Sequence, residues 1–452
     1  MSDLAIVVLA AGKGTRMKSE LPKVLHRAAG RSLLAHVLHA AKDLAPSRAV
    51  VVAGPGMDNV AAEATSIFPQ AVCAVQNERL GTGHAVSMAR EHLQGFNGTV
   101  LILYGDVPLI TAESLRGLTA LVTTQHPLAV LGFEAADPHG YGRLIRNALG
   151  DVVAIREQLD ATLEERQITL CNSGIIAISA GLLWNLLPKI KNSNAKGEYY
   201  LTDLVELGAI AGSACGLAIC PESEVAGVND RIQLAGIEAT LQTAYRRKHL
   251  LNGATLTAPD TVFFSADTVI GRDVVIEPSV VFGPGVSVAD NVEILAFSHL
   301  EGTQIGQGAR IGPFARLRPG AQIGDAAHIG NFVEVKKAVI GHGAKANHLT
   351  YIGDARVGRR TNIGAGTITC NYDGYEKHLT DIGENVFVGS NTALVAPVKI
   401  GDGASIAAGS VITRDIPADA LAMTRPGLDV RPGWAARNRE IKAARKAAKR
   451  KS

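Results

Sequence analysis

Apolar residues recur along this chain with two different periods, and the change of period divides the sequence. Up to about residue 229, apolar runs of strand length alternate with stretches of helical spacing. The runs lie at residues 4–11, 49–53, 100–104 and 128–133. The clearest helical spacing joins Leu33, Val37, Ala40, Ala41 and Leu44. This alternation predicts an α/β domain over residues 1–229, built on a mainly parallel sheet.

A helix is predicted over residues 230–252. Leu234, Ile237, Leu241 and Ala244 follow one another at three- and four-residue steps, and a basic run at 246–248 would occupy the last turns. Gly253 supplies a stop signal. We interpret this segment as a linker helix between the two parts of the chain.

After residue 253 the apolar period becomes six residues. The hexads run through Ile270, Ile276, Phe282, Val288 and Ile294, then Ile305, Ile311, Ile323, Ile329 and Val335, and finally Ile382, Val388, Ile400, Ile406 and Ile412. Glycine often follows the aliphatic residue, which would destabilise a helix but suits a short strand that ends in a tight corner. The pattern predicts stacked coils of parallel strands over residues 253–452, each coil burying its neighbour's face.

The hexads are interrupted between Thr369 and Ile382, where the sequence reads NYDGYEKHLT. We expect this segment to loop outward from the coil. Loops on rigid scaffolds often carry function, so the interruption is a place to look for chemistry, although a bare loop remains an alternative.

Charge is unevenly distributed along the 452 residues, which contain 45 Lys and Arg against 42 Asp and Glu. Residues 431–452 contain nine of the basic residues and a single acid, which leaves 36 against 41 elsewhere. A body with excess acid would repel nucleic acid, so we expect no nucleic-acid partner and interpret the basic residues as a tail.

The cysteine pattern and the hydropathy predict a cytoplasmic protein. Cys73, Cys171, Cys215, Cys220 and Cys370 are odd in number and scattered, which argues against a disulfide framework or a zinc site. No apolar stretch approaches the roughly 18 residues of a membrane span, so we expect no membrane association.

A glycine-rich turn follows the first predicted strand, in the sequence LAAGKGTRMKSELPK. Its spacing fits neither the Walker loop nor the dinucleotide fingerprint. Small residues would let backbone N–H groups approach an anion or a flat base, and Lys13, Arg16, Lys18 and Lys23 lie close by. An ordinary solvated turn remains the alternative.

Asp106 ends the run LILYGD, at the carboxyl end of a predicted parallel strand. Open α/β sheets bind ligands at this edge, and a carboxylate there would suit Mg²⁺ that carries phosphates. Asp106 could equally cap the next helix.

Charged residues interrupt the neutral repeats of the second half. They are Arg316, Arg318, Lys336, Lys337 and His348. Pairs of Arg and Lys suggest an anion site, and a His within reach suggests a general base near neutral pH, although a lone His on a coil face is more often a solvated residue.

Several motifs together resemble one family. They are LAAGKGTRM, ERLGTGHA, YGDVP, DPHGYGRLIR and NAKGEYYLTD, in this order and followed by hexapeptide repeats. They resemble the sugar nucleotidyltransferases and, in particular, the family of bifunctional N-acetylglucosamine-1-phosphate uridylyltransferase/glucosamine-1-phosphate acetyltransferases. The resemblance spans essentially the whole chain, and it implies that the coil is a left-handed parallel β-helix.

For the first half the resemblance implies a Mg²⁺-dependent uridylyltransferase site that uses UTP. The uridine and phosphates would be held by Leu9, Ala10, Ala11 and Gly12, with Arg16 and Lys23 as the catalytic cations. Uracil would be read by Gln76, Gly81 and Thr82, and the nucleotide sugar would face Tyr104 and Gly105. The acetamido sugar would contact Gly142, Glu157 and Asn172, of which Glu157 lies in the loosest match. The metal ligands would be Asp106 and Asn229.

For the second half the resemblance implies an acetyltransferase site that uses acetyl-CoA, with His348 as the catalytic base. Arg318 and Lys336 would bind the sugar phosphate, and Tyr351 and Asn362 would orient the sugar. The acetyl-CoA site would be lined by Ala365, Asn371, Tyr372, Ser390, Ala408 and Arg425. Family members are trimers, so the resemblance also implies a homotrimer.

The function expected from the resemblance is synthesis of UDP-N-acetylglucosamine, which feeds cell-wall and lipopolysaccharide precursors. Acetyl transfer to glucosamine-1-phosphate would precede uridylyl transfer. One alternative is a nucleotidyltransferase whose coil only trimerises it; another is a non-catalytic scaffold that binds sugar nucleotide. The basic tail would either help to hold the coenzyme's phosphates or remain solvated.

Overall fold

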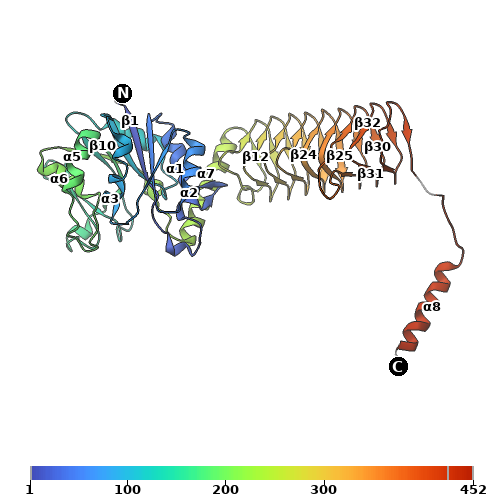
Figure 1. Cartoon of the computed structure of the whole chain (residues 1–452), viewed down its shortest axis with the longest axis horizontal. Coiled ribbons are helices and arrows are strands. Elements are labelled where there is room, and N and C mark those ends of the chain that lie inside the picture. Colours follow the sequence, from blue (N-terminus) through green and yellow to red (C-terminus); the bar gives the residue numbers. More distant parts are fainter. Residues whose placement is uncertain (1–2, 425–426, 450–452) are drawn as a thin grey trace. The chain divides into compact units, whose positions relative to one another are not determined.

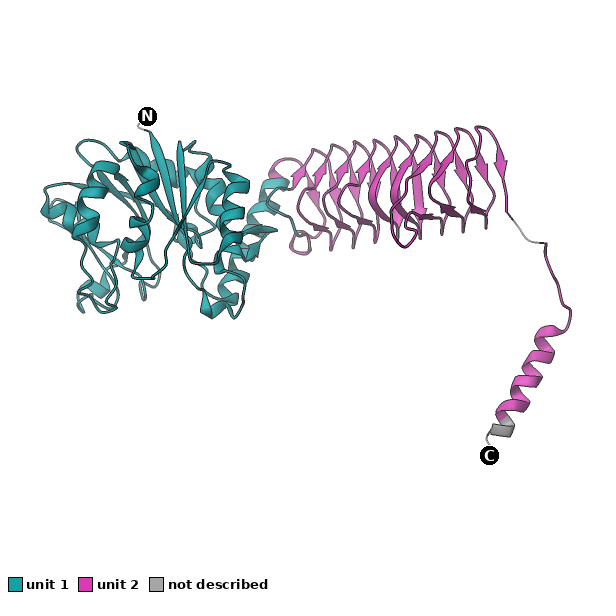
Figure 2. Ribbon diagram, viewed as in Figure 1, with its two compact units in different colours: residues 1–249, 263–267 teal, residues 250–262, 268–452 magenta. Residues whose placement is uncertain are grey.

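The structure is a computed structural model that describes residues 3–424 and 427–449, and it divides into two compact units (Figures 1 and 2). The first unit comprises residues 1–249 and 263–267, and the second comprises residues 250–262 and 268–452. Each unit is described by itself below.

A twisted sheet forms the centre of the first unit, with the strand order β11-β7-β10-β6-β1-β4-β5. Its strands are β1 (Leu4–Leu9), β4 (Arg48–Ala53), β5 (Val72–Val75), β6 (Thr99–Tyr104), β7 (Leu128–Glu134), β10 (Leu170–Ser179) and β11 (Cys215–Ile219). Pairs along this path are parallel except those of β10, which runs antiparallel to both neighbours. A side hairpin of β8 (Arg143–Arg146) and β9 (Val152–Arg156) joins β10 through β8. The predicted mainly parallel sheet is confirmed.

Helices cover both faces of this sheet, because the buried strands are apolar on both sides. In β1, Ile6 and Val8 belong to one apolar cluster, and Ala5 and Val7 belong to the other. The first cluster packs under α1 (Leu33–Lys42), α2 (Asp58–Ile67) and α4 (Ala112–Ala120). The second packs under α3 (Thr82–Ser87), α5 (Ala180–Leu186) and α6 (Asp203–Ile210).

The predicted linker helix is α7 (Arg231–Leu251), and it packs on the first unit along much of its length. Ile237 and Leu241 share an apolar cluster with Met17 and Leu33. Gln242 donates to the backbone carbonyl of Phe264 at 2.7 Å and accepts from its N–H at 2.8 Å. These contacts fix the helix on the first unit, so it is part of the packed structure of that unit and not a free linker.

The second unit is a left-handed parallel β-helix of stacked coils, in which each face is a ladder of short parallel strands (Figure 1). One face is formed by β12 (Thr255–Leu256), β14 (Val275–Ile276), β17 (Glu293–Ile294), β20 (Arg310–Ile311), β23 (His328–Asn331), β25 (Lys345–His348), β27 (Asn362–Ile363), β30 (Phe387–Val388), β33 (Ser405–Ile406) and β35 (Leu421–Ala422). Another contains β13 (Val269–Ile270), β16 (Ser287–Val288), β19 (Gln304–Ile305), β22 (Gln322–Ile323), β24 (Glu334–Ile340), β26 (Tyr351–Val357), β29 (Thr380–Ile382) and β32 (Val398–Ile400). The third contains β15 (Val281–Phe282), β18 (His299–Leu300), β21 (Arg316–Leu317), β28 (Ile368–Cys370), β31 (Ala393–Val395) and β34 (Val411–Ile412), with the first part of β24 and of β26.

The hexad residues fill the interior, as predicted. Ile276, Ile294, Ile311 and Ile329 follow one another in successive coils, and none is measurably exposed. The interruption at residues 371–379 leaves the coil, and Tyr375 within it is 94% exposed. Because of this insertion, Ala355 pairs with Thr380, a spacing of 25 residues instead of the usual 17 or 18.

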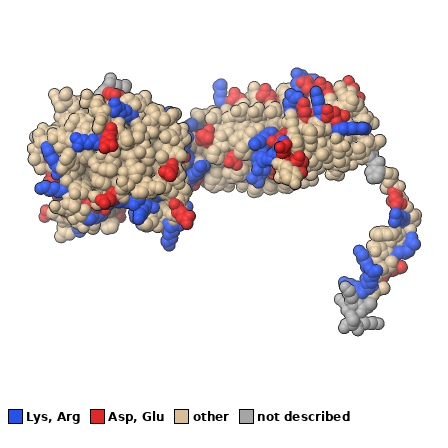
Figure 3. All heavy atoms as spheres, in the orientation of Figure 1, with Lys and Arg blue, Asp and Glu red and all other residues tan. Residues whose placement is uncertain are grey.

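The basic tail forms the helix α8 (Trp434–Lys449). In Figure 3 blue Lys and Arg side chains recur along this segment between uncharged ones, whereas the coil shows broad areas free of either charge. The predicted basic tail is therefore helical over these residues. Among the described residues, no helix is long and apolar enough to cross a membrane, and all five cysteines are free.

Candidate functional sites

A cavity of about 340 Å³ opens at the carboxyl ends of β1 and β6, where an open α/β sheet is expected to bind ligands. Most of the predicted nucleotide residues line it. The lining consists of Leu9, Ala10, Ala11, Gly12, Lys23, Val24, Gln76, Arg79, Gly81, Thr82, Ala85, Tyr104, Asp106 and Glu198. The glycine-rich turn therefore forms one wall of a cavity, which disfavours the alternative of an ordinary solvated turn. Gly105 lies directly behind this wall, and its N–H donates to the carbonyl of Leu9 at 3.0 Å.

Four predicted residues from distant segments meet at one end of the cavity. Lys23 Nζ forms an ion pair with Asp106 and donates to Asn229 Oδ1 at 3.2 Å. Arg16 donates to the same Asn229 oxygen at 2.9 Å. Asp106 and Asn229 are also joined through the backbone, because the N–H of Val228 donates to the Asp106 carbonyl at 3.0 Å.

This cluster suits a divalent cation whose remaining ligands would be oxygens of the substrate phosphates. Asp106 and Asn229 present two oxygens to a single cationic atom, and a carboxylate and an amide oxygen are the donors that hard cations prefer. The described residues contain no group of three or more His, Cys, Asp or Glu that could hold a metal by itself. Asp106 does not cap a helix, since α4 begins at Ala112 and its N-cap is Thr111.

The polar groups at the other end of the cavity suit a planar base. Gln76 is buried, and its Nε2 donates to the Gly81 carbonyl at 3.2 Å and to His84 Nδ1 at 3.1 Å. Its amide oxygen has no partner among the described residues and can accept from a ligand. Gly81 has φ +118°, and a β-carbon there would lie 2.6 Å from the carbonyl oxygen of Tyr199. Only glycine allows the GTGHA and GEYYLTD segments to approach this closely.

The three predicted sugar contacts lie next to one another. The N–H of Asn172 donates to the Gly142 carbonyl at 2.8 Å, and a β-carbon on Gly142 would lie 3.5 Å from Glu157 Oε1. Burial raises the pKa of the Glu157 carboxyl, and the nearby Lys196 opposes this effect. Burial raises the pKa of Tyr104, and the nearby Glu157 is the next largest cause. Because Tyr104 also lines the cavity, it connects the cavity to the three predicted sugar contacts.

Two charged residues that line the cavity were missed in the sequence, as were the apolar Val24 and Ala85. Arg79 donates from Nε to the carbonyl of Ala11 at 2.7 Å, which fixes its guanidinium against the glycine-rich turn. Glu198 comes from the GEYYLTD segment. Both belong to recognised motifs, but nothing in their spacing distinguishes them from solvated neighbours.

In the second unit four of the predicted residues lie along one corner of the coil. His348, Ala365 and Ser390 occupy equivalent positions, because their carbonyls accept from Gly366, Asn391 and Gly409 in successive coils. Ala408 directly precedes Gly409 and continues this row. With a rise of roughly 4.8 Å per coil, the row from His348 to Ala408 extends about 15 Å.

The hydrogen bond of His348 defines its tautomer. His348 Nδ1 lies 2.7 Å from Asn331 Oδ1, in the preceding coil. An amide oxygen can only accept, so Nδ1 carries a proton, and in the neutral form of the ring the lone pair is on Nε2. Asn331 was missed in the sequence, although the 17-residue register with His348 is a signal that could have found it.

Cationic side chains gather beside this corner. Arg318 donates to Glu334 Oε1 at 2.7 Å, and this bond raises the pKa of Arg318. The pKa of Lys336 is lowered, first by Lys377 and then by Arg318. Tyr351 pairs with Glu334 across neighbouring coils. The structure therefore brings Arg318, Lys336 and Tyr351 together and adds Lys377, which sequence reasoning missed.

The outward loop carries two of the predicted coenzyme residues. Asn371 is buried at its base and donates to Asp354, while Tyr372 is 60% exposed. Asp373 holds the loop in shape by accepting from the N–H groups of Tyr375 and Glu376, both at 2.8 Å. Of the remaining predictions, Asn362 begins β27 beside Lys345, and Arg425 lies outside the described residues.

Comparisons with known proteins bear on both units. The MobA-like NTP transferase domain matches residues 6–168, and the bacterial transferase hexapeptide family matches residues 267–302, 302–337 and 380–414. "Bifunctional protein GlmU" of Rhodospirillum rubrum is 59% identical over 97% of this chain and 98% of its own length. The chain belongs to the bifunctional GlmU family. Relatives of the same name from Cereibacter sphaeroides and Azorhizobium caulinodans are 53% and 55% identical, over 99% and 98% of this chain and 98% of each relative.

Membership of the GlmU family confirms the predicted family, the predicted fold and the prediction of an enzyme. A solved structure, the inositol-1-phosphate CTP transferase from T. maritima, matches 53% of this chain and 97% of its own at 14% identity with a TM-score of 0.42, a likeness too low to argue from. The GlmU match covers both units, so both the sheet and the coil are parts that this family shares. The roles of individual residues stay predictions.

Proposed function

We propose that the chain makes UDP-N-acetylglucosamine in two steps, one in each unit. The first is acetyl transfer from acetyl-CoA to glucosamine-1-phosphate, and the second is uridylyl transfer from UTP to the resulting N-acetylglucosamine-1-phosphate. The observation that carries this function is membership of the GlmU family over 97% of the chain. The cavity of the first unit and the corner row of the second are the two places where the steps would occur.

In the uridylyl step, the sugar phosphate oxygen attacks the α-phosphorus of UTP and pyrophosphate leaves. No nucleophilic side chain is needed, because catalysis of such transfers rests on positioning and neutralisation of charge. Arg16 and Lys23 supply positive charge at the triphosphate. Asp106 and Asn229 would hold Mg²⁺, which neutralises phosphate charge when bound. Gln76 offers its free amide oxygen to the N–H of uracil.

In the acetyl step, the 2-amino group of glucosamine-1-phosphate attacks the thioester carbonyl of acetyl-CoA. A C–N bond forms, the C–S bond breaks, and the coenzyme leaves as its thiol. His348 Nε2 takes the proton that the amine loses and returns it to the departing sulfur, and Asn331 keeps the ring in the tautomer that can do so. Arg318 and Lys336 lie together and suit the sugar phosphate.

The acetyl-CoA arm would lie along the corner row. Ala365, Ser390 and Ala408 are small and lie in line with His348, so an extended chain can follow them from coil to coil. Asn371 and Tyr372 would add contacts from the loop, and Arg425 stays a contact predicted from the sequence. We further propose a homotrimer in the cytoplasm, as hexapeptide repeats favour oligomers.

The test supplies the purified chain with glucosamine-1-phosphate, acetyl-CoA, UTP and Mg²⁺, and follows free thiol and pyrophosphate separately. We expect thiol without UTP, and pyrophosphate only when acetyl-CoA and UTP are both present. If thiol never appears and pyrophosphate requires ready-made N-acetylglucosamine-1-phosphate, the coil is only a scaffold. If neither product appears, the chain binds sugar nucleotide without turning it over.

A further inference from the structure

Arg143 has the largest fully buried side chain among the described residues. It begins β8, directly after Gly142, and only 1% of it is exposed. Within residues 3–424 and 427–449, no carboxylate forms an ion pair with it. A buried cation without a counter-charge is costly unless hydrogen bonds compensate it, and here both terminal nitrogens are bonded while Nε has no partner among the described residues.

The partners of this guanidinium are oxygens of the surrounding loops. Arg143 donates to the carbonyl of Tyr141, to Gln158 Oε1 at 2.9 Å and to the carbonyl of Arg166 at 3.2 Å. Gln158 Oε1 also accepts from the N–H of Gly140 at 3.1 Å. A single amide oxygen therefore joins the loop before β8 to the segment after β9.

These contacts lie one residue away from two proposed sugar contacts. Arg143 follows Gly142, and Gln158 follows Glu157. The bond between Arg143 and Gln158 consequently sets the spacing between the Gly142 backbone and the Glu157 carboxylate. None of the atoms in this bond needs to touch the substrate.

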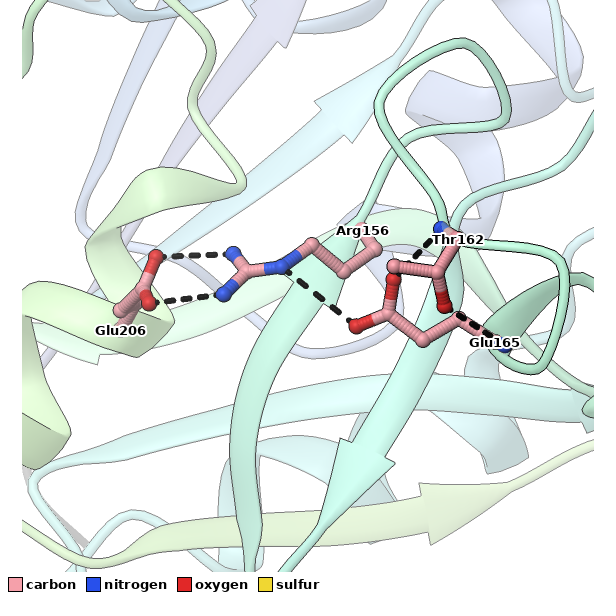
Figure 4. A network of polar contacts seen from close by, with 4 residues as sticks. All are labelled: Arg156, Thr162, Glu165 and Glu206. Atoms are coloured by element: carbon pink, nitrogen blue, oxygen red, sulfur yellow. Dashed lines mark hydrogen bonds and ion pairs between the residues drawn. The ribbon is translucent and has the colours of Figure 1, made fainter.

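Arg156, the residue before Glu157, is anchored as well (Figure 4). Arg156 makes a two-pronged bond to Glu206, with both distances at 2.8 Å, and lies 3.7 Å from Glu165. The second Glu165 oxygen accepts from the N–H of Thr162 at 2.8 Å. The residues before and after Glu157 are thus both anchored.

We propose that Arg143 is a positioning residue of the sugar-phosphate site, which acts through Gln158 to fix Gly142 and Glu157 at the spacing that an N-acetylhexosamine phosphate requires. This inference rests on the proposed uridylyl transfer. It assigns to Arg143 and Gln158 an effect on the sugar substrate and none on the nucleotide.

The experiment uses the full chain and a matched pair of variants, Gln158→Ala and Gln158→Glu. Glu keeps an oxygen that can accept from Arg143 and Gly140, whereas Ala removes it. We expect Gln158→Ala to raise the KM for N-acetylglucosamine-1-phosphate about 10-fold and to leave the KM for UTP within about 2-fold. Gln158→Glu should stay within about 3-fold of the wild type for both substrates.

Arg143→Ala adds a second line of evidence. We expect a larger rise in the KM for the sugar phosphate, partly reversed by added guanidinium ion, which can enter the space that the side chain leaves. Acetyl transfer, followed as thiol release by the same preparations, should be unchanged. If Arg143→Ala does not fold, the Gln158 pair decides the question alone.

Three results would overturn the inference: equal KM rises for both substrates, equal behaviour of Gln158→Ala and Gln158→Glu, or an unchanged sugar KM in Gln158→Ala. If the wild type releases no pyrophosphate, the proposed function fails instead. Calorimetric binding of UDP-N-acetylglucosamine then tests the positioning role, since Gln158→Ala must weaken it and Gln158→Glu must preserve it.

Discussion

The two units build their sites in opposite ways. In the first unit, Arg16, Lys23, Asp106 and Asn229 come from segments up to 213 residues apart and bond to one another. In the second, His348 and Arg318 each have a partner one coil away, in Asn331 and Glu334. A site made of long-range contacts depends on the whole fold, whereas a site made of repeats depends on a few neighbouring coils.

This difference predicts that the two activities can be removed separately. The largest effect is expected for His348→Ala, which should lower acetyl transfer about 1,000-fold, because it removes the base that accepts the amine's proton. Uridylyl transfer from ready-made N-acetylglucosamine-1-phosphate should not change. Separate thiol and pyrophosphate assays check this, and loss of both activities in a folded variant would contradict the division of labour.

The reverse separation is expected for Asp106→Ala. Pyrophosphate release should fall about 100-fold or more, because the change removes a charged ligand for the metal and the partner of Lys23. Thiol release should keep its wild-type rate. Titration with Mg²⁺ provides the control, since a variant that lost a metal ligand should require more metal to reach half of its remaining rate.

A smaller effect should reveal how local the second site is. Asn331→Ala should lower acetyl transfer about 10- to 100-fold, since the ring of His348 then loses the acceptor that sets its tautomer. Asn331→Asp keeps an acceptor oxygen and should retain most of the rate. Similar losses in both variants would mean that the hydrogen bond does not control the base.

The first unit should also be the more sensitive to acid. Burial, more than any other cause, lowers the pKa of His36 and of His249 from 6.5 to about 4. Between these values the unfolded chain binds protons that the folded chain does not, so this stability is present above pH 6.5 and lost as the pH falls towards 4. The loss should be on the order of 2 kcal/mol for each imidazole.

Urea unfolding at pH 7 and pH 5, followed by the fluorescence of Trp184 in a Trp434→Phe background, measures this loss in the first unit. His36→Gln combined with His249→Gln should flatten the pH dependence, even if the variant is less stable at pH 7. A pH dependence that survives both substitutions would show that other groups cause it.

The fold could be predicted from the sequence further than the sites could. The six-residue period correctly predicted that Ile311 and Ile329 lie in the coil interior, because the same backbone position is buried in every repeat. Arg79 could not be found in this way. Its role depends on which residue lies opposite in space, and no periodic pattern records that. Arg143, a basic residue in a strand, gave no sign that it would be buried.

In the corner row of the second unit, the number of coils fixes the distance between the first and the last site residue. His348 and Ala408 are separated by three coils, and each coil adds a fixed increment of length. A whole coil inserted between them would leave every side chain correctly oriented and yet displace the far contact by one increment. Insertions and deletions here are therefore constrained in size as well as in phase. The 25-residue coil meets this constraint by sending its surplus outward as a loop.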